Sequence, residues 1–275
     1  MPTLHHHHRA PLLRPAAAIS RRTLLLSSTA LPLSPKPPDT TITDRVFLDF
    51  SICPNFLRPD RALSDTVSSL CYSDSAPLGR VILGLYGRHV PLTVSNFRSA
   101  CSSSLYRNTL VHKILPGQYL LAGRQGPRGD RGGVVVRDPS GLARNAEAVE
   151  SKAFQLTHSR GGLVSLCLSE NDDEDDVKLD PEYRNVEFLI TTGPGPCPDL
   201  DYKNIVFGVV LEGLDVVTAI ASIPTYKPSE KIRQFNDFAE FLGDERAQSA
   251  RGSWNRPLKT IYISDCGELK VTKPS

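Results

Sequence analysis

The chain has 275 residues, a hydrophobic fraction of 40% and a formal net charge of +2. This length suffices for one large domain or two small ones, and the apolar content suffices for a sizeable core. The near-neutral charge gives no field that would indicate nucleic acid or an anionic membrane as a partner. No apolar run approaches the roughly 20 residues of a membrane helix. We therefore expect no integral membrane segment.

Residues 1–42 differ in composition from the rest of the chain. Several arginines, many serines and alanines and a dense set of prolines precede Asp39, the first acidic residue. Such a composition is typical of organelle transit peptides. Arg21 and Arg22 stand before a short apolar stretch, as in a twin-arginine export signal. The pattern predicts a chloroplast protein sent on to the thylakoid lumen, with residues 1–42 removed or disordered; a generic disordered arm is the alternative.

After residue 42, the sequence pattern predicts many short strands and two core-facing helices. Alternating apolar residues and turn signals predict strands at 45–51, 79–86, 111–115, 119–122, 134–136, 162–168, 186–192, 205–210 and 259–265. Residues 91–101 and 215–223 have helical apolar stripes, and Pro91 suits a first helical position. This arrangement predicts an antiparallel β-barrel.

Three segments interrupt this pattern, at about 53–75, 170–184 and 226–257. The first reads as a long surface connection. The second carries the acidic run 171–176, which either steers basic peptides toward the domain or is a solvated loop; its spacing does not match an EF-hand. The third contains Phe235, Phe238 and Phe241 on one face of a short helix. That face either packs on the barrel or docks a partner, and we expect packing.

Two other groups of residues bear on nucleic-acid binding, metal binding and disulfide formation: the arginines of one loop and the cysteines. The loop 123–133 contains Arg124, Arg128 and Arg131, but it lacks the interleaved aromatic residues of nucleic-acid sites, so we interpret it as a surface loop. None of the six cysteines has a zinc-ligand spacing, and we expect neither a metal nor a cofactor. Cys53 and Cys71 bracket the excursion between two predicted strands. A disulfide between them is geometrically conceivable, although we favour reduced thiols for all six cysteines.

Several segments of the sequence, in this order along the chain, resemble segments of the cyclophilins, the peptidyl-prolyl isomerases. They are Val46 to Phe50, Pro77 to Phe97, His112-Lys113 followed by Pro116-Gly117, Val206 to Val217, and Ile261 to Gly267. The resemblance implies a closed eight-stranded antiparallel β-barrel capped by two α-helices. It would span residues 43–270, with an inserted segment before the last strand and a tail at 271–275.

The resemblance also implies an activity that needs neither a nucleophile nor a metal. Cyclophilins aim an arginine at the prolyl nitrogen of a twisted X-Pro bond, and Lys113 matches that catalytic position. Residues that match substrate-binding positions are His112, Gln118, Tyr119, Leu121, Glu187, Leu189, Leu200 and Asn204. The implied partners are proline-containing peptides or client proteins, and we expect a monomer.

Most of these positions depart from the usual residues of the family. Lysine keeps the charge of arginine but lacks its planar fork of donors. The family has a phenylalanine and a methionine at Gln118 and Tyr119, glutamines at Leu121 and Glu187, and a phenylalanine at Leu189. These changes predict an isomerase of reduced activity that assists folding or assembly and binds cyclosporin, an inhibitor of the family, weakly. The alternative is a catalytically inert peptide- or protein-binding module.

Overall fold

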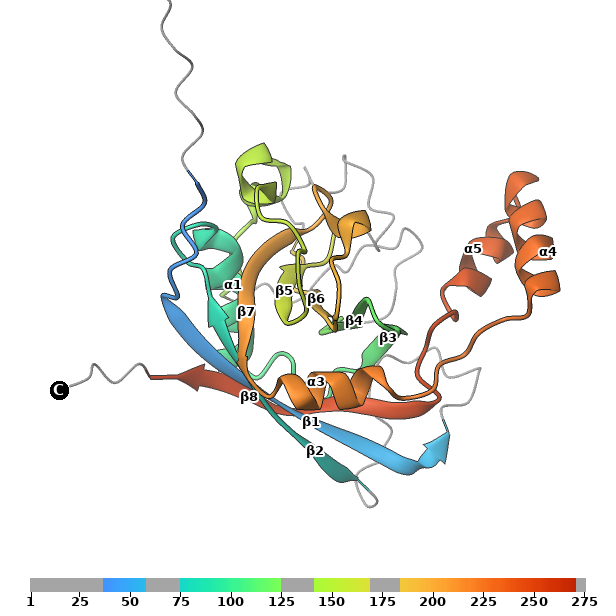
Figure 1. Ribbon diagram of the computed structural model, residues 1–275, viewed down its shortest axis with the longest axis horizontal. Coiled ribbons are helices and arrows are strands. Elements are labelled where there is room, and N and C mark those ends of the chain that lie inside the picture. The colour runs from blue at the N-terminus through green and yellow to red at the C-terminus, as the bar shows by residue number, and fades with distance from the viewer. Residues whose placement is uncertain (1–36, 58–74, 125–140, 169–183, 271–275) are drawn as a thin grey trace, which may run out of the picture. The chain divides into compact units, whose positions relative to one another are not determined.

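The structure is a computed structural model, and it describes residues 37–57, 75–124, 141–168 and 184–270. One antiparallel sheet of eight strands dominates the described part of the chain (Figure 1), in the order β3-β4-β6-β5-β7-β2-β1-β8. The strands are β1 (Asp44–Leu57), β2 (Ala76–Leu85), β3 (Val111–Leu115), β4 (Tyr119–Ala122), β5 (Leu163–Leu166), β6 (Phe188–Thr191), β7 (Ile205–Glu212) and β8 (Lys259–Leu269). The helices are α1 (Pro91–Ser102), α3 (Leu214–Ala221), α4 (Glu230–Phe241) and α5 (Glu245–Arg251), with 3₁₀ turns η2 (Ala146–Val149), η3 (Ser151–Phe154) and η4 (Pro198–Leu200).

The sheet curls until its two edge strands meet. Leu110, just before β3, forms a bridge with Tyr262 of β8. The N–H of Ile263 donates to the carbonyl of Thr109 at 2.9 Å, and the N–H of Asn108 donates to the carbonyl of Ile263 at 2.8 Å. These contacts make the sheet a nearly closed barrel, which confirms the predicted fold class.

The barrel interior is filled by alternate residues of the strands. Val46, Leu48 and Phe50 of β1 are completely or almost completely buried, as the period of two along a strand requires. Helix α1 adds Phe97, whose ring lies 5.2 Å from that of Tyr106 and contacts two more phenylalanine rings of the core. Tilted and edge-on rings at this spacing pack favourably. The core therefore fixes α1 against β8 and β1.

The second core-facing helix, α3, follows β7 through a single glycine. Gly213 has a φ of +84°, and a Cβ there would collide with the carbonyl oxygen of Arg80. Only glycine fits this close approach without moving the backbone. The tight turn lays α3 against β2, where Val216, Val217 and Ile220 are buried.

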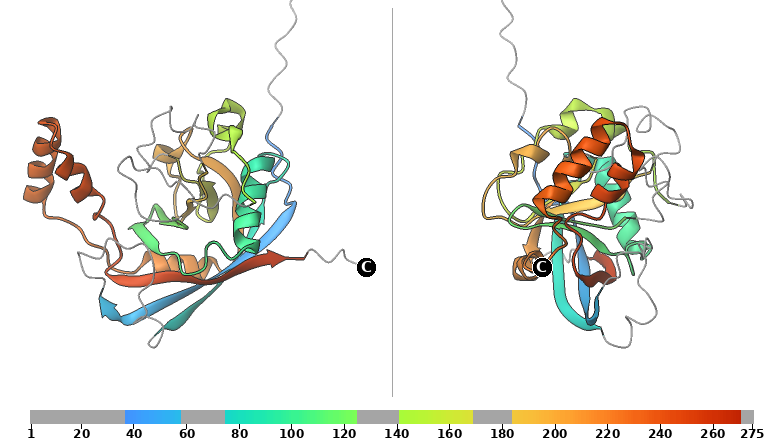
Figure 2. Two further views of the ribbon diagram at one scale, coloured as in Figure 1. Left: turned by 180° about the vertical axis from the view of Figure 1, so that it is seen from behind. Right: turned by 90° about the vertical axis from the view of Figure 1, so that its right-hand side faces the viewer.

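The segment between α3 and β8 leaves the barrel as a pair of helices, α4 and α5 (Figures 1 and 2). Its two ends are paired with each other: the N–H of Tyr226 donates to the carbonyl of Arg256, and the N–H of Asn255 donates to the carbonyl of Tyr226, both at 2.9 Å. Arg251 of α5 joins the helices, with its Nη2 atom 2.6 Å from carboxylate oxygens of Asp237 and Glu240 on α4. We call residues 226–257 the insertion.

The aromatic face of α4 does not contact the barrel. Phe235, Phe238 and Phe241 are 76%, 60% and 86% exposed. The expectation that this face packs on the barrel is wrong. Helical periodicity predicts which residues share a face, but it does not say whether another element lies close enough to cover that face.

The remaining strand and helix predictions within the described residues are confirmed, with boundaries shifted by a few residues. Strand β1 continues to Leu57, so the expectation of a surface connection is wrong over residues 53–57, and residues 58–74 lie outside the described part of the chain. The predicted strand 134–136 and the acidic run 171–176 lie outside the described residues. Within those residues, none of the helices combines the length and apolarity that a membrane crossing would need.

The cysteines differ in state. Cys101, Cys167, Cys197 and Cys266 are free and buried, as expected. Cys53 is fully buried and disulfide-bonded, so the expectation of a reduced thiol is wrong there. Cys71, the partner considered above, lies outside the described residues.

Candidate functional site

Three neighbouring strands present one outer face beside Lys113. Lys113 of β3 lies opposite Leu121 of β4, and Leu121 lies opposite Leu189 of β6. Directly paired residues of a sheet point to the same face, so these three side chains share a face. Ile114, Leu120 and Ile190 point the other way, into the core. Lys113 is half-buried and stands at the edge of an apolar surface.

His112 sits at an irregularity in β3. The pairing with β4 shifts register between Val111 and Lys113, and such a bulge re-aims the intervening side chain. The imidazole is buried, with Nε2 only 2.6 Å from Oε1 of Glu187. Glu187, immediately before β6, is itself completely buried. A bulge in the strand thus brings His112 to a buried carboxylate.

Arg124 is a further partner of Glu187. Its Nη2 lies 3.1 Å from Oε1 of Glu187 and its Nε lies 3.4 Å from Oε2. Burial by itself would raise the pKa of Glu187, but the charges and hydrogen bonds of His112 and Arg124 hold that pKa well below its usual range. The carboxylate is therefore ionised, and it ties β3, β6 and the end of β4 together.

This role of Arg124 is not apparent from the residues around it in the sequence. Residues 123–133 were expected to form a surface loop, yet Arg124 is buried, so that expectation is wrong at this residue; Arg128 and Arg131 lie outside the described residues. The signal in the sequence was Glu187 itself. A carboxylate beside the apolar run 188–190 needs a buried cation as its partner.

Four of the predicted substrate-binding residues belong to a compact apolar cluster. We call it the pocket cluster, and its members are Tyr119, Leu121, Cys167, Leu189, Cys197 and Leu200. No member is more than 7% exposed. Sγ of Cys197 lies 3.5 Å from the carbonyl oxygen of Gln118. The residues to which the resemblance assigns the proline ring are therefore buried in this structure.

The two remaining predicted residues lie on either side of this cluster. Gln118 is exposed in the turn between β3 and β4. Asn204 is fully buried: its Oδ1 accepts a hydrogen bond from the N–H of Leu168 at 2.8 Å, and its Nδ2 donates to the carbonyl of Leu200 at 3.3 Å. Among the nine predicted residues, only Lys113 and Gln118 reach solvent in the structure.

A buried serine and a buried histidine also converge with a partly exposed aspartate near the cluster. His158 Nδ1 lies 2.8 Å from Oδ1 of Asp201, and His158 Nε2 lies 2.7 Å from Oγ of Ser165. Ser165 and His158 are completely buried, so no substrate carbonyl can approach the hydroxyl. The arrangement links β5 to the loop after η4 and is structural, not hydrolytic.

The chemistry that the outer face offers is electrostatic. Lys113 supplies N–H donors and a positive charge beside an apolar surface, which suits stabilisation of a developing lone pair. Within the described ranges, no three histidine, cysteine or carboxylate side chains are arranged to hold a metal ion.

Comparisons with known proteins identify the family of the chain. The family model described as cyclophilin type peptidyl-prolyl cis-trans isomerase/CLD matches residues 71–236. The chain is 69% identical over 246 residues to the Arabidopsis thaliana protein named peptidyl-prolyl cis-trans isomerase CYP28, chloroplastic, covering 88% of this chain and 86% of that protein.

More distant relatives carry the same family name. The chain is 28% identical to Arabidopsis thaliana peptidyl-prolyl cis-trans isomerase CYP26-2, chloroplastic, over 94% of this chain and 88% of the relative. It is 26% identical to peptidyl-prolyl cis-trans isomerase D of Saccharomyces cerevisiae, over 78% and 79% of the two chains. With the barrel topology and the matched segment together, the chain belongs to the cyclophilin-type peptidyl-prolyl cis-trans isomerases.

Proposed function

We propose that this domain isomerises X-Pro bonds through Lys113, at a rate below that of family members with an arginine at this position. The observation that carries the proposal is the shared outer face of Lys113, Leu121 and Leu189. This arrangement supports the proposal because a cation on that face would lie beside the surface to which the resemblance assigns the proline. The ionised Glu187 carboxylate lies beneath and holds the bulged strand in place.

Catalysis of rotation about the X-Pro bond requires little beyond this arrangement. The barrier to rotation about the peptide bond is roughly 18–20 kcal/mol and arises from amide resonance. In the twisted state the prolyl nitrogen regains a lone pair, so a donor aimed at it stabilises the transition state more than the ground state. The Lys113 ammonium can donate to that nitrogen. It cannot also hold a nearby carbonyl in the fixed geometry of a guanidinium, which is why the rate is reduced.

The pocket cluster lowers the rate further. A proline ring must enter an apolar surface to be held while its amide rotates, and here Tyr119, Leu189 and Cys197 are buried in the pocket cluster. Binding requires these side chains to move, and their displacement reduces affinity. The substitutions at Tyr119, Leu121 and Leu189 therefore weaken substrate binding as well as catalysis.

An exchange experiment tests the activity directly. Two-dimensional NMR exchange spectra of a short proline peptide report cis–trans interconversion, which without a catalyst takes tens to hundreds of seconds. Adding the full chain at substoichiometric concentration is expected to produce exchange cross-peaks that grow with protein concentration. Absence of exchange at every concentration would overturn the proposal.

The closed pocket cluster favours a second candidate function, a peptide- or protein-binding module without catalysis. The same spectra distinguish this module from the isomerase. A module would broaden or shift the peptide resonances on binding without cis–trans exchange cross-peaks. The isomerase produces exchange cross-peaks.

We propose further that residues 1–42 direct the protein to the chloroplast and on to the thylakoid lumen, where it acts as a monomer on client proteins. The relative at 69% identity is named chloroplastic. Two observations support the rest: the paired Arg21 and Arg22 before an apolar stretch, and the disulfide-bonded Cys53, because disulfides persist in oxidising compartments. Mass spectrometry of the native protein tests this, with a mature N-terminus expected near Thr43. A retained residue 1 would contradict it.

A further inference from the structure

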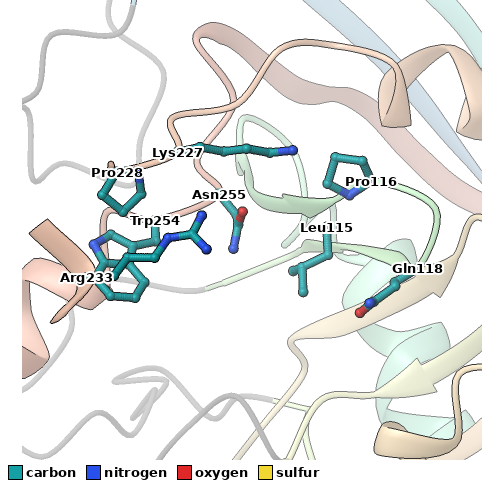
Figure 3. Close-up of a pocket in the computed structure, with 8 residues that line it drawn as sticks. All are labelled: Leu115, Pro116, Gln118, Lys227, Pro228, Arg233, Trp254 and Asn255. Carbon is teal, nitrogen blue, oxygen red and sulfur yellow. The ribbon is translucent and has the colours of Figure 1, made fainter. Parts of the chain in front are cut away.

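A cleft lies between the turn that follows β3 and the base of the insertion (Figure 3). It has a volume of about 300 Å³, and we call it the insertion cleft. Its lining residues are Leu115, Pro116, Gln118, Lys227, Pro228, Arg233, Trp254 and Asn255. The barrel and the insertion each contribute one wall.

Hydrogen bonds hold the two walls in register. The N–H of Ile114 in β3 donates to the carbonyl of Asn255 at 2.8 Å, and the N–H of Asn255 donates to the carbonyl of Tyr226. One residue of the insertion therefore bonds both to β3 and to the other end of the insertion. The cleft is built into the fold, at the residue next to Lys113.

The insertion cleft continues the outer face of β3. Lys113 and Leu115 are two residues apart in a regularly paired stretch, so their side chains point to the same side. Their separation along the strand is about 7 Å, or roughly two residues of an extended peptide. A peptide with its proline at Lys113 reaches the insertion cleft with a residue two or three positions from the proline.

The cleft has a positive and partly aromatic lining. Lys227 and Arg233 are exposed and form no ion pair with any described residue, and none of the described residues that line the cleft is a carboxylate. Of the acidic residues of α4, Asp237 and Glu240 are held by Arg251, and Glu230 does not line the cleft. In Figure 3, Lys227 extends toward Pro116 and the guanidinium of Arg233 lies between Trp254 and Asn255.

We propose that the insertion cleft is a specificity subsite that binds an acidic side chain two or three residues from the substrate proline. The two cations attract and hydrogen-bond the carboxylate, while Trp254, Pro116 and Pro228 pack against the neighbouring peptide backbone. The placement relative to the proline rests on the function proposed above. Carboxylate binding in the cleft does not, so the two can be tested apart.

The sequence supplies a reporter for this site. Trp254 is the single tryptophan of the chain, so its fluorescence reports occupation of the cleft alone. The probes are nine-residue peptides, acetylated and amidated at their ends, with one central proline and no aromatic residue. Glutamate stands two or three positions before or after the proline, and matched peptides carry glutamine there.

Titration of the full chain is expected to give one glutamate position whose peptide binds about five- to tenfold tighter than its glutamine match, the effect of two partly exposed ion pairs. Arg233→Gln and Lys227→Gln should each reduce this ratio toward one. Lys231→Gln is the matched control, because Lys231 is an exposed cation of α4 that does not line the cleft. It should leave the ratio unchanged.

Equal affinity for glutamate and glutamine peptides at all four positions would overturn the proposal, as would an equal loss in the Lys231→Gln control. Isomerisation of the same peptides is followed in parallel by NMR exchange. Fluorescence discrimination without exchange supports the subsite and contradicts the catalytic proposal. Exchange without discrimination does the reverse.

Discussion

Nε2 of His112 lies 2.6 Å from Oε1 of Glu187, and this contact connects the irregular strand β3 to the strand that carries Leu189. Arg124 binds the same carboxylate from the end of β4. Three strands of the candidate site are thus joined by one ionised group in the protein interior. The geometry around Lys113 depends on that group.

Replacing Glu187 should be costly for stability. Glu187→Gln introduces the residue that the family usually has, but it leaves the buried Arg124 without its carboxylate. Loss of one partner of a buried pair costs about 3–5 kcal/mol, so the urea midpoint of unfolding should fall markedly. Asp49→Asn is the control, because the Arg80–Asp49 pair lies near the surface and should cost at most about 1 kcal/mol. Equal effects of the two variants would contradict the role given to Glu187.

Acidification should destabilise the protein through His158. Burial lowers the pKa of this histidine, although Asp201 opposes the effect. The unfolded chain takes up a proton near pH 6.5, and the folded state takes it up only at a lower pH. Stability is therefore full above that pH and decreases as the pH falls below it, by at most about 1.4 kcal/mol per pH unit.

Two measurements check this sign. Urea unfolding between pH 8 and pH 5 should show stability decreasing from about pH 6.5 downward, to which His89, whose pKa burial also lowers, contributes in the same direction. In an NMR titration, the His158 ring resonances should have a midpoint below 6.5. A midpoint above 6.5 would show that the Asp201 contact outweighs burial.

Cyclosporin should bind weakly, because the side chains of the pocket cluster are buried and must move before a ligand can reach them. Titration calorimetry with the full chain is expected to show no saturable heat at micromolar concentrations. Leu189→Ala opens space in the cluster and should strengthen binding relative to the unmodified protein. A complex of the unmodified protein with a dissociation constant below about 1 µM would contradict the closed cluster.

Much of the barrel could be predicted from the sequence, because its strands alternate apolar and polar residues and its turns carry glycine or proline. Val46, Leu48 and Phe50 are inward-facing as their spacing requires. The contact between Arg124 and Glu187 could not be predicted in this way, since 63 residues separate them and only the fold brings them together. The exposure of Phe235 likewise depends on the path of the insertion in the fold, which the local sequence does not indicate.

Only part of the candidate site could be proposed from the sequence. The match of Lys113 to the catalytic position came from the neighbouring residues of β3, which are local in sequence. Closure of the pocket cluster depends on Cys167 and Cys197, which the sequence analysis did not place in the site. Their side chains reach Leu189 and Leu200 because strands β5 and β6 and the loop before η4 converge, and no local pattern records that convergence.

The central claim is that Lys113 is the donor that accelerates isomerisation. The most direct test compares the NMR exchange rate of one proline peptide with the unmodified chain, Lys113→Ala and Lys113→Arg, each checked for unchanged urea stability. The account predicts that Lys113→Ala loses most of the catalysed rate and that Lys113→Arg exceeds the unmodified protein. Equal catalysed rates in all three proteins would contradict it.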